Sequence, residues 1–183
     1  MKNLFEKFVP WKILRYLSFH STSGVYVQEL ARKLDLSAGM CSKVLKEFEA
    51  EGILRKRDLG KAHYYQLEDI YVTRALKRFV AAHLIHVSGL LDRLKDAFPG
   101  ALSYALYGSF AKGDYIEKSD LDILVISPVK AKIDLKDIEN AVGFEINITA
   151  MSLGQWSKLG KKNDPFYREV MSNHLLLDGG ELP

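Results

Sequence analysis

Two aspartates, Asp120 and Asp122, stand at the start of an apolar run that ends at Ile126. Side chains two residues apart on a strand share a face, so both carboxylates point the same way. Adjacent carboxylates on a mostly buried strand repel each other and are costly to desolvate, and a divalent cation is the usual resolution. Hard oxygen ligands beside a phosphate substrate indicate Mg²⁺.

A glycine-serine turn, Gly108-Ser109, precedes this pair and follows the apolar run of residues 101–107. Backbone N–H groups at such a turn attract anions, and a serine hydroxyl adds a donor. A phosphate cradle about ten residues before a metal-binding pair is what phosphoryl or nucleotidyl transfer requires. The alternative is a surface loop followed by a strand with a polar start.

The pattern Gly108-Ser109-x-Ala111-x-Gly113, followed by Ser119-Asp120-x-Asp122, resembles the signature of the DNA polymerase β-like nucleotidyltransferase superfamily. The likeness is strongest to the minimal nucleotidyltransferases of bacteria and archaea, and it covers residue 101 to the C-terminus. It implies a nucleoside triphosphate substrate, ATP in the first place, and Mg²⁺. The residues implied to bind the nucleotide are Gly108, Ser109, Lys112, Gly113 and Ser119, although Lys112 is equally well explained as a solvated lysine.

The resembled family needs a third carboxylate on a neighbouring strand. Residues 143–149 alternate between apolar and polar side chains, as a strand with one buried face does. Glu145 is the best candidate, so the predicted catalytic and metal-binding set is Asp120, Asp122 and Glu145. Aspartate is the common residue at that family position, and an ordinary solvent-facing glutamate is the alternative.

The composition is that of an ordinary soluble globular protein: 183 residues, 48% hydrophobic and 27% charged. No apolar run approaches the ~18–20 residues that span a bilayer, and the N-terminus is patterned as an amphipathic helix and not as a signal peptide. The single Cys41 excludes an intramolecular disulfide. We therefore expect a cytoplasmic protein with no membrane partner.

The N-terminal part predicts a helix-turn-helix. Leu30 and Leu34 place one helix over about 27–33, and Ser37 is a good N-cap for a second helix that runs to about Glu51. Strands over 53–57 and 62–67 would form a hairpin directly after it. Residues 9–70 thus resemble the winged helix-turn-helix domains of prokaryotic transcription regulators.

Such a domain would meet DNA through its second helix and its wing. Residues 1–72 hold 12 Lys and Arg against 9 Asp and Glu, whereas residues 73–183 hold 14 of each, so the net charge of +3 lies in the first part. Contact with another protein, or no surviving role, are the alternatives. The predicted DNA-binding residues are Ser42, Lys43, Lys46, Arg55, Lys56, Arg57 and Lys61.

We therefore expect an α+β protein with an N-terminal winged helix-turn-helix and a C-terminal, nucleotidyltransferase-like mixed sheet flanked by helices. The expected divisions are 1–70, a connecting helix over 71–98 that packs on both domains or forms a homodimer contact, and 99–183. Three functions stay open: an active nucleotidyltransferase, a transcription regulator that binds nucleotide, and an antitoxin-like binding protein. The resemblance also implies a helical partner protein.

Overall fold

The computed structural model describes residues 4–60 and 62–183, and the chain separates into two compact units. The first unit contains Met1–Val80 together with Asp114–Glu117. The second contains Ala81–Gly113 and Lys118–Pro183. The short segment between the glycine-serine turn and the aspartate pair thus belongs to the N-terminal unit.

The first unit is built on three helices: α1 (Val9–Phe19), α2 (Val27–Leu34) and α3 (Ala38–Ala50). The 3-10 helix η1 (Leu4–Lys7) precedes α1, and Pro10 lies in the first turn of α1, where its missing N–H is not needed. Pro10 therefore lies just inside the second of two short helices. The core joins α1, α2, α3 and the sheet through Ile13, Leu17, Leu30, Leu45 and Tyr65.

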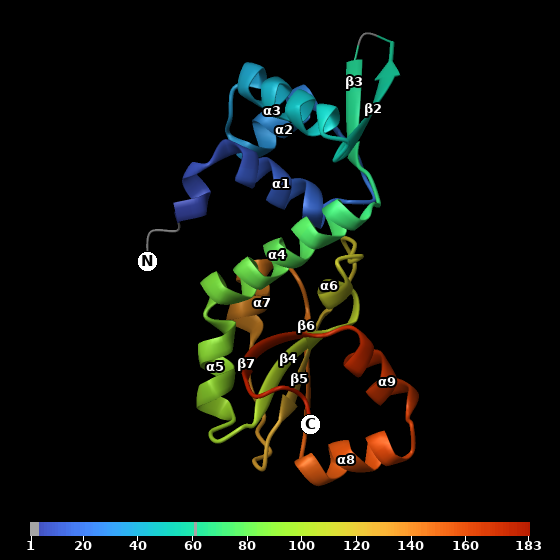
Figure 1. Cartoon of the computed structure of the whole chain (residues 1–183). Helices are drawn as coiled ribbons and strands as arrows, with labels where there is room; N and C mark the ends of the chain where they lie inside the picture. Colours follow the sequence, from blue (N-terminus) through green and yellow to red (C-terminus); the bar gives the residue numbers. More distant parts are fainter. Residues whose placement is uncertain (1–3, 61) are drawn as a thin grey trace. The chain divides into compact units, whose positions relative to one another are not determined.

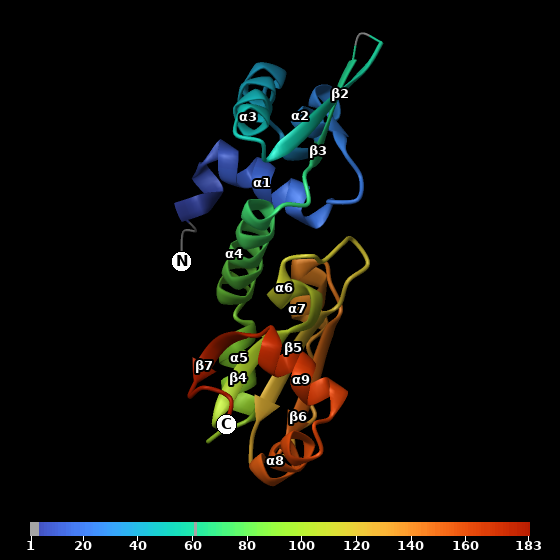
Figure 2. The same ribbon diagram turned by 45° about the vertical axis from the view of Figure 1, so that its right-hand side comes forward.

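The turn between α2 and α3 ends at Ser37, whose hydroxyl accepts a hydrogen bond from the Met40 amide at 3.2 Å. A sheet of order β1-β3-β2 follows, antiparallel throughout: β1 (Val25–Tyr26), β2 (Leu54–Leu59) and β3 (Ala62–Leu67). The β2–β3 hairpin projects beyond α2 and α3 as a wing (Figure 2). The predicted winged helix-turn-helix is confirmed.

The second unit holds a four-stranded mixed sheet of order β6-β5-β4-β7. β4 pairs antiparallel with β5 and β7, whereas β5 and β6 run parallel. β5 is the apolar run that begins at the aspartate pair, and five of its six residues are completely buried because it lies inside the sheet. The strands are β4 (Ser103–Tyr107), β5 (Leu121–Ile126), β6 (Ile146–Met151) and β7 (Leu175–Gly179).

Helices cover this sheet. In Figure 1, α8 and α9 lie against one face of the sheet, where Trp156 and Val170 pack on Ala105, Leu124 and Ile126. Ser152 starts α8 with a capping box, and Asp164 starts α9 by accepting from the Phe166 amide. The helices α5, α6 and α7 also belong to this unit. The bounds are α5 (Leu90–Ala97), α6 (Gly108–Lys112), α7 (Lys136–Val142), α8 (Leu153–Lys161) and α9 (Pro165–Ser172).

The single connecting helix expected up to residue 98 is wrong. α4 (Tyr71–Ser88) ends at Gly89, and α5 begins at Leu90. Gly89 adopts φ +73°, a left-handed conformation that glycine enters without steric cost and that no α-helix continues through. The apolar spacing runs through this point, which is why the sequence favoured one helix.

The fold class expected from the sequence, α+β with a mixed C-terminal sheet, is confirmed. Within residues 4–60 and 62–183, no helix combines the length and apolarity needed to cross a membrane.

Candidate functional site

The aspartate pair lies at the N-terminal end of β5. Asp120 directly precedes the strand and is exposed, whereas Asp122 is half-buried on it. Asp122 stands opposite Tyr107 on β4 and opposite Asn147 on β6. Side chains in register on neighbouring strands share a face, so the carboxylates lie beside Asn147 and at the end of the β4 strand that leads into the glycine-serine turn.

Gly108 brings this turn directly against Asp122. Its φ is +68°, and a Cβ atom placed on it would lie 2.7 Å from Oδ2 of Asp122. Both the backbone conformation and the close approach require a glycine here. The turn predicted to hold phosphate and the carboxylates predicted to hold a metal therefore meet at one point.

Asn147 joins the two carboxylates. Its Nδ2 donates to Oδ2 of Asp120 and to Oδ1 of Asp122, each at 3.2 Å. Sequence reasoning missed this residue, although the alternation over 143–149 already placed it on the same face as Glu145. The available signal was its register with Asp122, which depends on strand pairing and is not local in sequence.

Burial raises the pKa of Asp122, and the charges of Asp120 and Glu169 act in the same direction. The hydrogen bond from Asn147 opposes them by stabilising the ionised carboxylate. Glu169 lies on α9 and forms a 2.8 Å ion pair with Lys112. The surroundings of Asp122 thus carry several negative charges, which is an environment that a cation would stabilise.

Three of the remaining predicted nucleotide-binding residues lie in α6 or directly at its end. Ser109 is half-buried in its first turn, Lys112 is held by Glu169 at its end, and Gly113 forms the C-cap with φ +79°. Ser119 is half-buried just before Asp120. Lys112 is therefore already engaged by a carboxylate in this structure.

Glu145 is the third carboxylate that the sequence analysis predicted for this site. It is exposed and immediately precedes β6, where its main-chain carbonyl accepts from the Leu121 amide at 2.9 Å. In the part of the chain that the structure describes, no three His, Cys, Asp or Glu side chains gather as a metal site. Asp120 and Asp122 are brought together, but Glu145 is not grouped with them.

The donor set fits one Mg²⁺. Proteins commonly bind this ion through one or two carboxylates, and substrate phosphates supply further oxygens. Asp120 and Asp122 are such a pair, and they lie at the turn predicted to hold phosphate. These two residues would hold the ion.

The predicted DNA-binding residues lie on α3 and on the wing. Lys43 and Lys46 are exposed on α3, Ser42 is half-buried, and Lys43 lies 4.0 Å from Glu47. On β2, Arg55 and Arg57 are exposed, whereas Lys56 is half-buried and pairs with Asp58 at 3.3 Å. Lys61 lies outside the described residues.

Two of these cationic side chains, Lys46 and Arg57, are the most accessible to a DNA phosphate. Arg55 is engaged by Gln66 at 3.1 Å and approaches Glu68 at 4.0 Å. Lys46 and Arg57 are exposed and form no ion pair among residues 4–60 and 62–183. These two are therefore the residues best placed to meet a phosphate.

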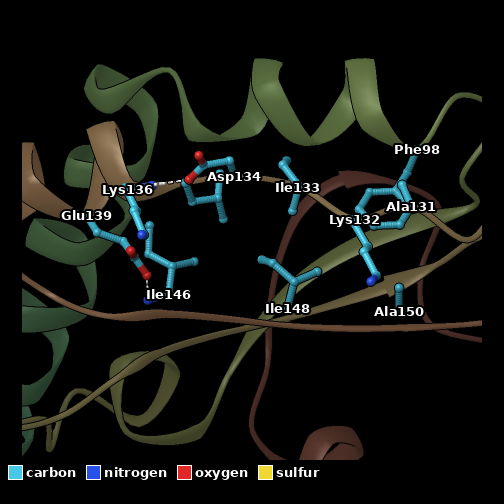
Figure 3. A pocket seen from close by; sticks show the side chains of 11 residues that line it. Phe98, Ala131, Lys132, Ile133, Asp134, Lys136, Glu139, Ile146, Ile148 and Ala150 are labelled. Carbon is cyan, nitrogen blue, oxygen red and sulfur yellow. Dashed lines mark hydrogen bonds between the residues drawn. The ribbon is translucent and has the colours of Figure 1, made fainter.

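A cavity of about 500 Å³ opens on the other face of β6 (Figure 3). Ile146, Ile148 and Ala150 alternate with Asn147 and Thr149 along the strand, so the cavity and the carboxylates lie on opposite faces of the sheet. None of the predicted nucleotide- or metal-binding residues lines it. Its walls are Phe98, Ala131, Lys132, Ile133, Asp134, Leu135, Lys136, Glu139, Ile146, Ile148 and Ala150.

A protein family and a solved structure are similar to this chain. No curated protein matches the chain. Among solved structures, the chain is similar to one titled "Structure of TrmBL2, an archaeal chromatin protein, shows a novel mode of DNA binding", at 15% identity over 93% of this chain and 73% of that one. The TM-score is 0.28, too low to support an argument. Residues 87–173 match the family described as nucleotidyltransferase domain, which supports the superfamily indicated by the glycine-serine turn and the aspartate pair.

Proposed function

We propose that the second unit is a Mg²⁺-dependent nucleotidyltransferase. It would move a nucleoside monophosphate from a nucleoside triphosphate, ATP in the first place, to a hydroxyl group of a small molecule or a protein. The observation that carries the proposal is the contact between the turn and the carboxylates, where Gly108 leaves no room for a side chain beside Asp122. The match of residues 87–173 to nucleotidyltransferase domains supports the reaction class.

Each part of the site has a stated role in this proposal. The main-chain amides of the Gly108–Ser109 turn and the Ser109 hydroxyl would bind the β- and γ-phosphates. Asp120 and Asp122 would hold Mg²⁺, which offsets negative charge on the triphosphate and on the departing pyrophosphate. The acceptor oxygen would bond to the α-phosphorus as the bond to pyrophosphate breaks, and the proton of the acceptor hydroxyl would pass to solvent water.

A second candidate is a regulator that binds nucleotide and does little chemistry. Asn147 favours it, because a neutral amide contacts the pair from the strand on which a third carboxylate was expected. An amide is not a base at neutral pH. Asn147 therefore cannot remove the proton from the acceptor hydroxyl, as a carboxylate at this position could. Both candidates share the same Mg²⁺-nucleotide site.

The first unit would recruit this site to DNA. Support comes from the helix-turn-helix, the projecting wing, and the exposed Lys46 and Arg57. Contact with a helical partner protein, or a homodimer, is the alternative use of this unit.

Label transfer tests the reaction. The protein is incubated with ATP labelled at the α-phosphate, with and without Mg²⁺, in the presence of candidate acceptors. We expect Mg²⁺-dependent transfer that is lost when Asp120→Asn and Asp122→Asn are combined, while Glu145→Gln retains it. Transfer that survives the double substitution would refute the site, and Mg²⁺-dependent nucleotide binding without transfer would favour the regulator.

A further inference from the structure

Asn147 lies beside the aspartate pair because of the register between β5 and β6. It stands opposite Asp122 in the parallel ladder between β5 and β6. One amide nitrogen lies 3.2 Å from a carboxylate oxygen of each aspartate. Glu145, two residues earlier, is exposed and is not grouped with them. The site is therefore two carboxylates bridged by a neutral donor.

The chemistry of an amide allows Asn147 to hold two carboxylates together. The NH₂ group carries two hydrogens, one for each carboxylate, whereas the amide oxygen would only repel them. Two like charges at one end of β5 would otherwise push apart. Asn147 thus does part of what a cation would do at this site, and it adds no negative charge of its own.

We propose that Asn147 is a positioning residue that holds Asp120 and Asp122 together and keeps the affinity of the site for a free divalent cation low. The cation then binds together with the nucleotide, whose phosphate oxygens supply the ligands that the protein lacks. This inference rests on the proposed function for the identity of that second ligand. The number of charged ligands is what tunes divalent-cation affinity in oxygen sites, and here it is two where a third carboxylate would make it three.

Titration of the whole chain with MgCl₂ or MnCl₂ alone, with calorimetry as the readout, tests this inference without any enzymatic measurement. Asn147→Asp is expected to raise the affinity for the free cation at least about tenfold, because it adds a third negative ligand in register. The same variant should melt at a lower temperature than the wild type without a cation, because three carboxylates then converge with no bridging donor. Mg²⁺ should restore most of that loss.

Two matched variants separate position from charge. Ala150→Asp adds a carboxylate to the same strand at an exposed residue on the opposite face, and it should leave cation affinity unchanged. Glu145→Gln removes the only other acidic side chain that the strand pattern placed on the Asn147 face, and it should also leave cation affinity unchanged. Melting curves with and without Mg²⁺ show whether each variant is folded.

Three results would overturn the inference: Asn147→Asp with wild-type cation affinity, Ala150→Asp with an equal gain, or Glu145→Gln with a marked loss. The nucleotide is scored separately, by adding a non-hydrolysable ATP analogue to wild-type protein with Mg²⁺. Absence of analogue binding would refute the proposed function, whereas an unchanged Asn147→Asp titration beside normal analogue binding would refute only the role of Asn147.

Discussion

Gly108 and Asp122 contact each other so closely that the residue type at position 108 becomes a test of the site. A methyl group at this position would lie 2.7 Å from the Asp122 carboxylate, and φ is +68°. Gly108→Ala should therefore cost about 1–3 kcal/mol of unfolding free energy and displace the carboxylate. Denaturant unfolding and Mg²⁺-dependent binding of an ATP analogue measure the two effects.

Gly39 provides the matched control for that substitution. It lies in α3, and a Cβ atom added to it meets nothing within 4 Å. Gly39→Ala should leave nucleotide binding intact and change stability by at most about 1 kcal/mol, in the stabilising direction. Equal losses in both variants would show that the contact at Gly108 is not special.

Lys77 is a buried lysine whose lowered pKa should make the stability of the protein depend on pH. Its side chain is buried in the first unit, where it donates to the Tyr115 carbonyl and to the Ser21 hydroxyl. Burial lowers the pKa of Lys77 to about 8, although Asp114, Asp69 and Glu117 act in the opposite direction. The unfolded chain therefore binds more protons than the folded chain between pH 8 and about 10.5, and stability should rise with pH across this window.

The expected gain from Lys77 across this window is up to about 3 kcal/mol. Lys77→Met removes this titration, so the unfolding free energy of the wild type should rise relative to that of the variant as the pH rises from 8 to 10.5. Urea unfolding at several pH values measures it. A difference that stays constant over this range would contradict the lowered pKa.

Single residues show where sequence reasoning succeeds and fails. Asp120, Asp122 and Gly108 were predictable because their types and spacing are unusual within one short stretch of chain. Asn147 was not, because its role depends on being paired with Asp122 across two strands that are 25 residues apart in sequence. The neighbouring Glu145 attracted the prediction because it is acidic, and acidity is visible in a sequence whereas register is not.

At the scale of elements, local signals predicted most of the fold. The cap at Ser37 and the alternating or apolar strands act within a few residues, and the structure forms the corresponding helix and strands. The break at Gly89 was missed because the apolar periodicity continues on both sides of it. One glycine in a helical pattern is compatible with a continuous helix and with a break between two helices. The left-handed conformation of Gly89, which the sequence does not reveal, produces the break.

The segment Asp114–Glu117 is an element whose packing the sequence did not reveal. Glu117 accepts hydrogen bonds from the Thr22 hydroxyl at 2.6 Å and amide at 3.2 Å, and from the Ser23 amide at 3.3 Å. Although burial raises the pKa of Glu117, these hydrogen bonds hold it below its ordinary value. The ionised carboxylate therefore fixes the segment in the first unit, and its stabilising effect should disappear as the pH falls through that lowered pKa.

Glu117→Gln should lower the unfolding free energy by about 1–2 kcal/mol at neutral pH, because it removes charge-assisted hydrogen bonds. A double-mutant cycle with Thr22→Val isolates the direct interaction from other effects of either change. A coupling energy near zero would show that the contact adds no stability. The loss in Glu117→Gln should also diminish at acidic pH, where the wild-type carboxyl group is protonated.

At the scale of the whole molecule, the two-part organisation was predictable because each part carries its own motif. What the sequence did not show is that the chain returns to the first unit between the glycine-serine turn and the aspartate pair. The contacts that hold it there join residues about 95 apart in sequence, and no local pattern encodes such a pairing.

DNA binding by the first unit predicts a steep dependence on salt. Each phosphate contact contributes about −0.9 to the slope of log affinity against log salt concentration. Combining Lys46→Ala with Arg57→Ala should weaken binding to duplex DNA and make the slope shallower by about 1–2. Fluorescence anisotropy at several salt concentrations measures both quantities.

The control for the DNA experiment is a pair of lysines in the second unit, Lys158→Ala with Lys161→Ala on α8, which removes the same charge. It should leave affinity and slope close to those of the wild type. Equal effects of the two pairs, or binding that does not vary with salt, would argue against contact through α3 and the wing. The protein-contact alternative would then be favoured.

The most direct test of the central claim is calorimetric binding of a non-hydrolysable ATP analogue to the whole chain. We predict saturable binding with one site per chain that requires Mg²⁺. It should be lost in Asp122→Asn and retained in Glu145→Gln. Binding that is independent of Mg²⁺, or that survives Asp122→Asn unchanged, would contradict a nucleotide site formed by the Gly108 turn and the aspartate pair.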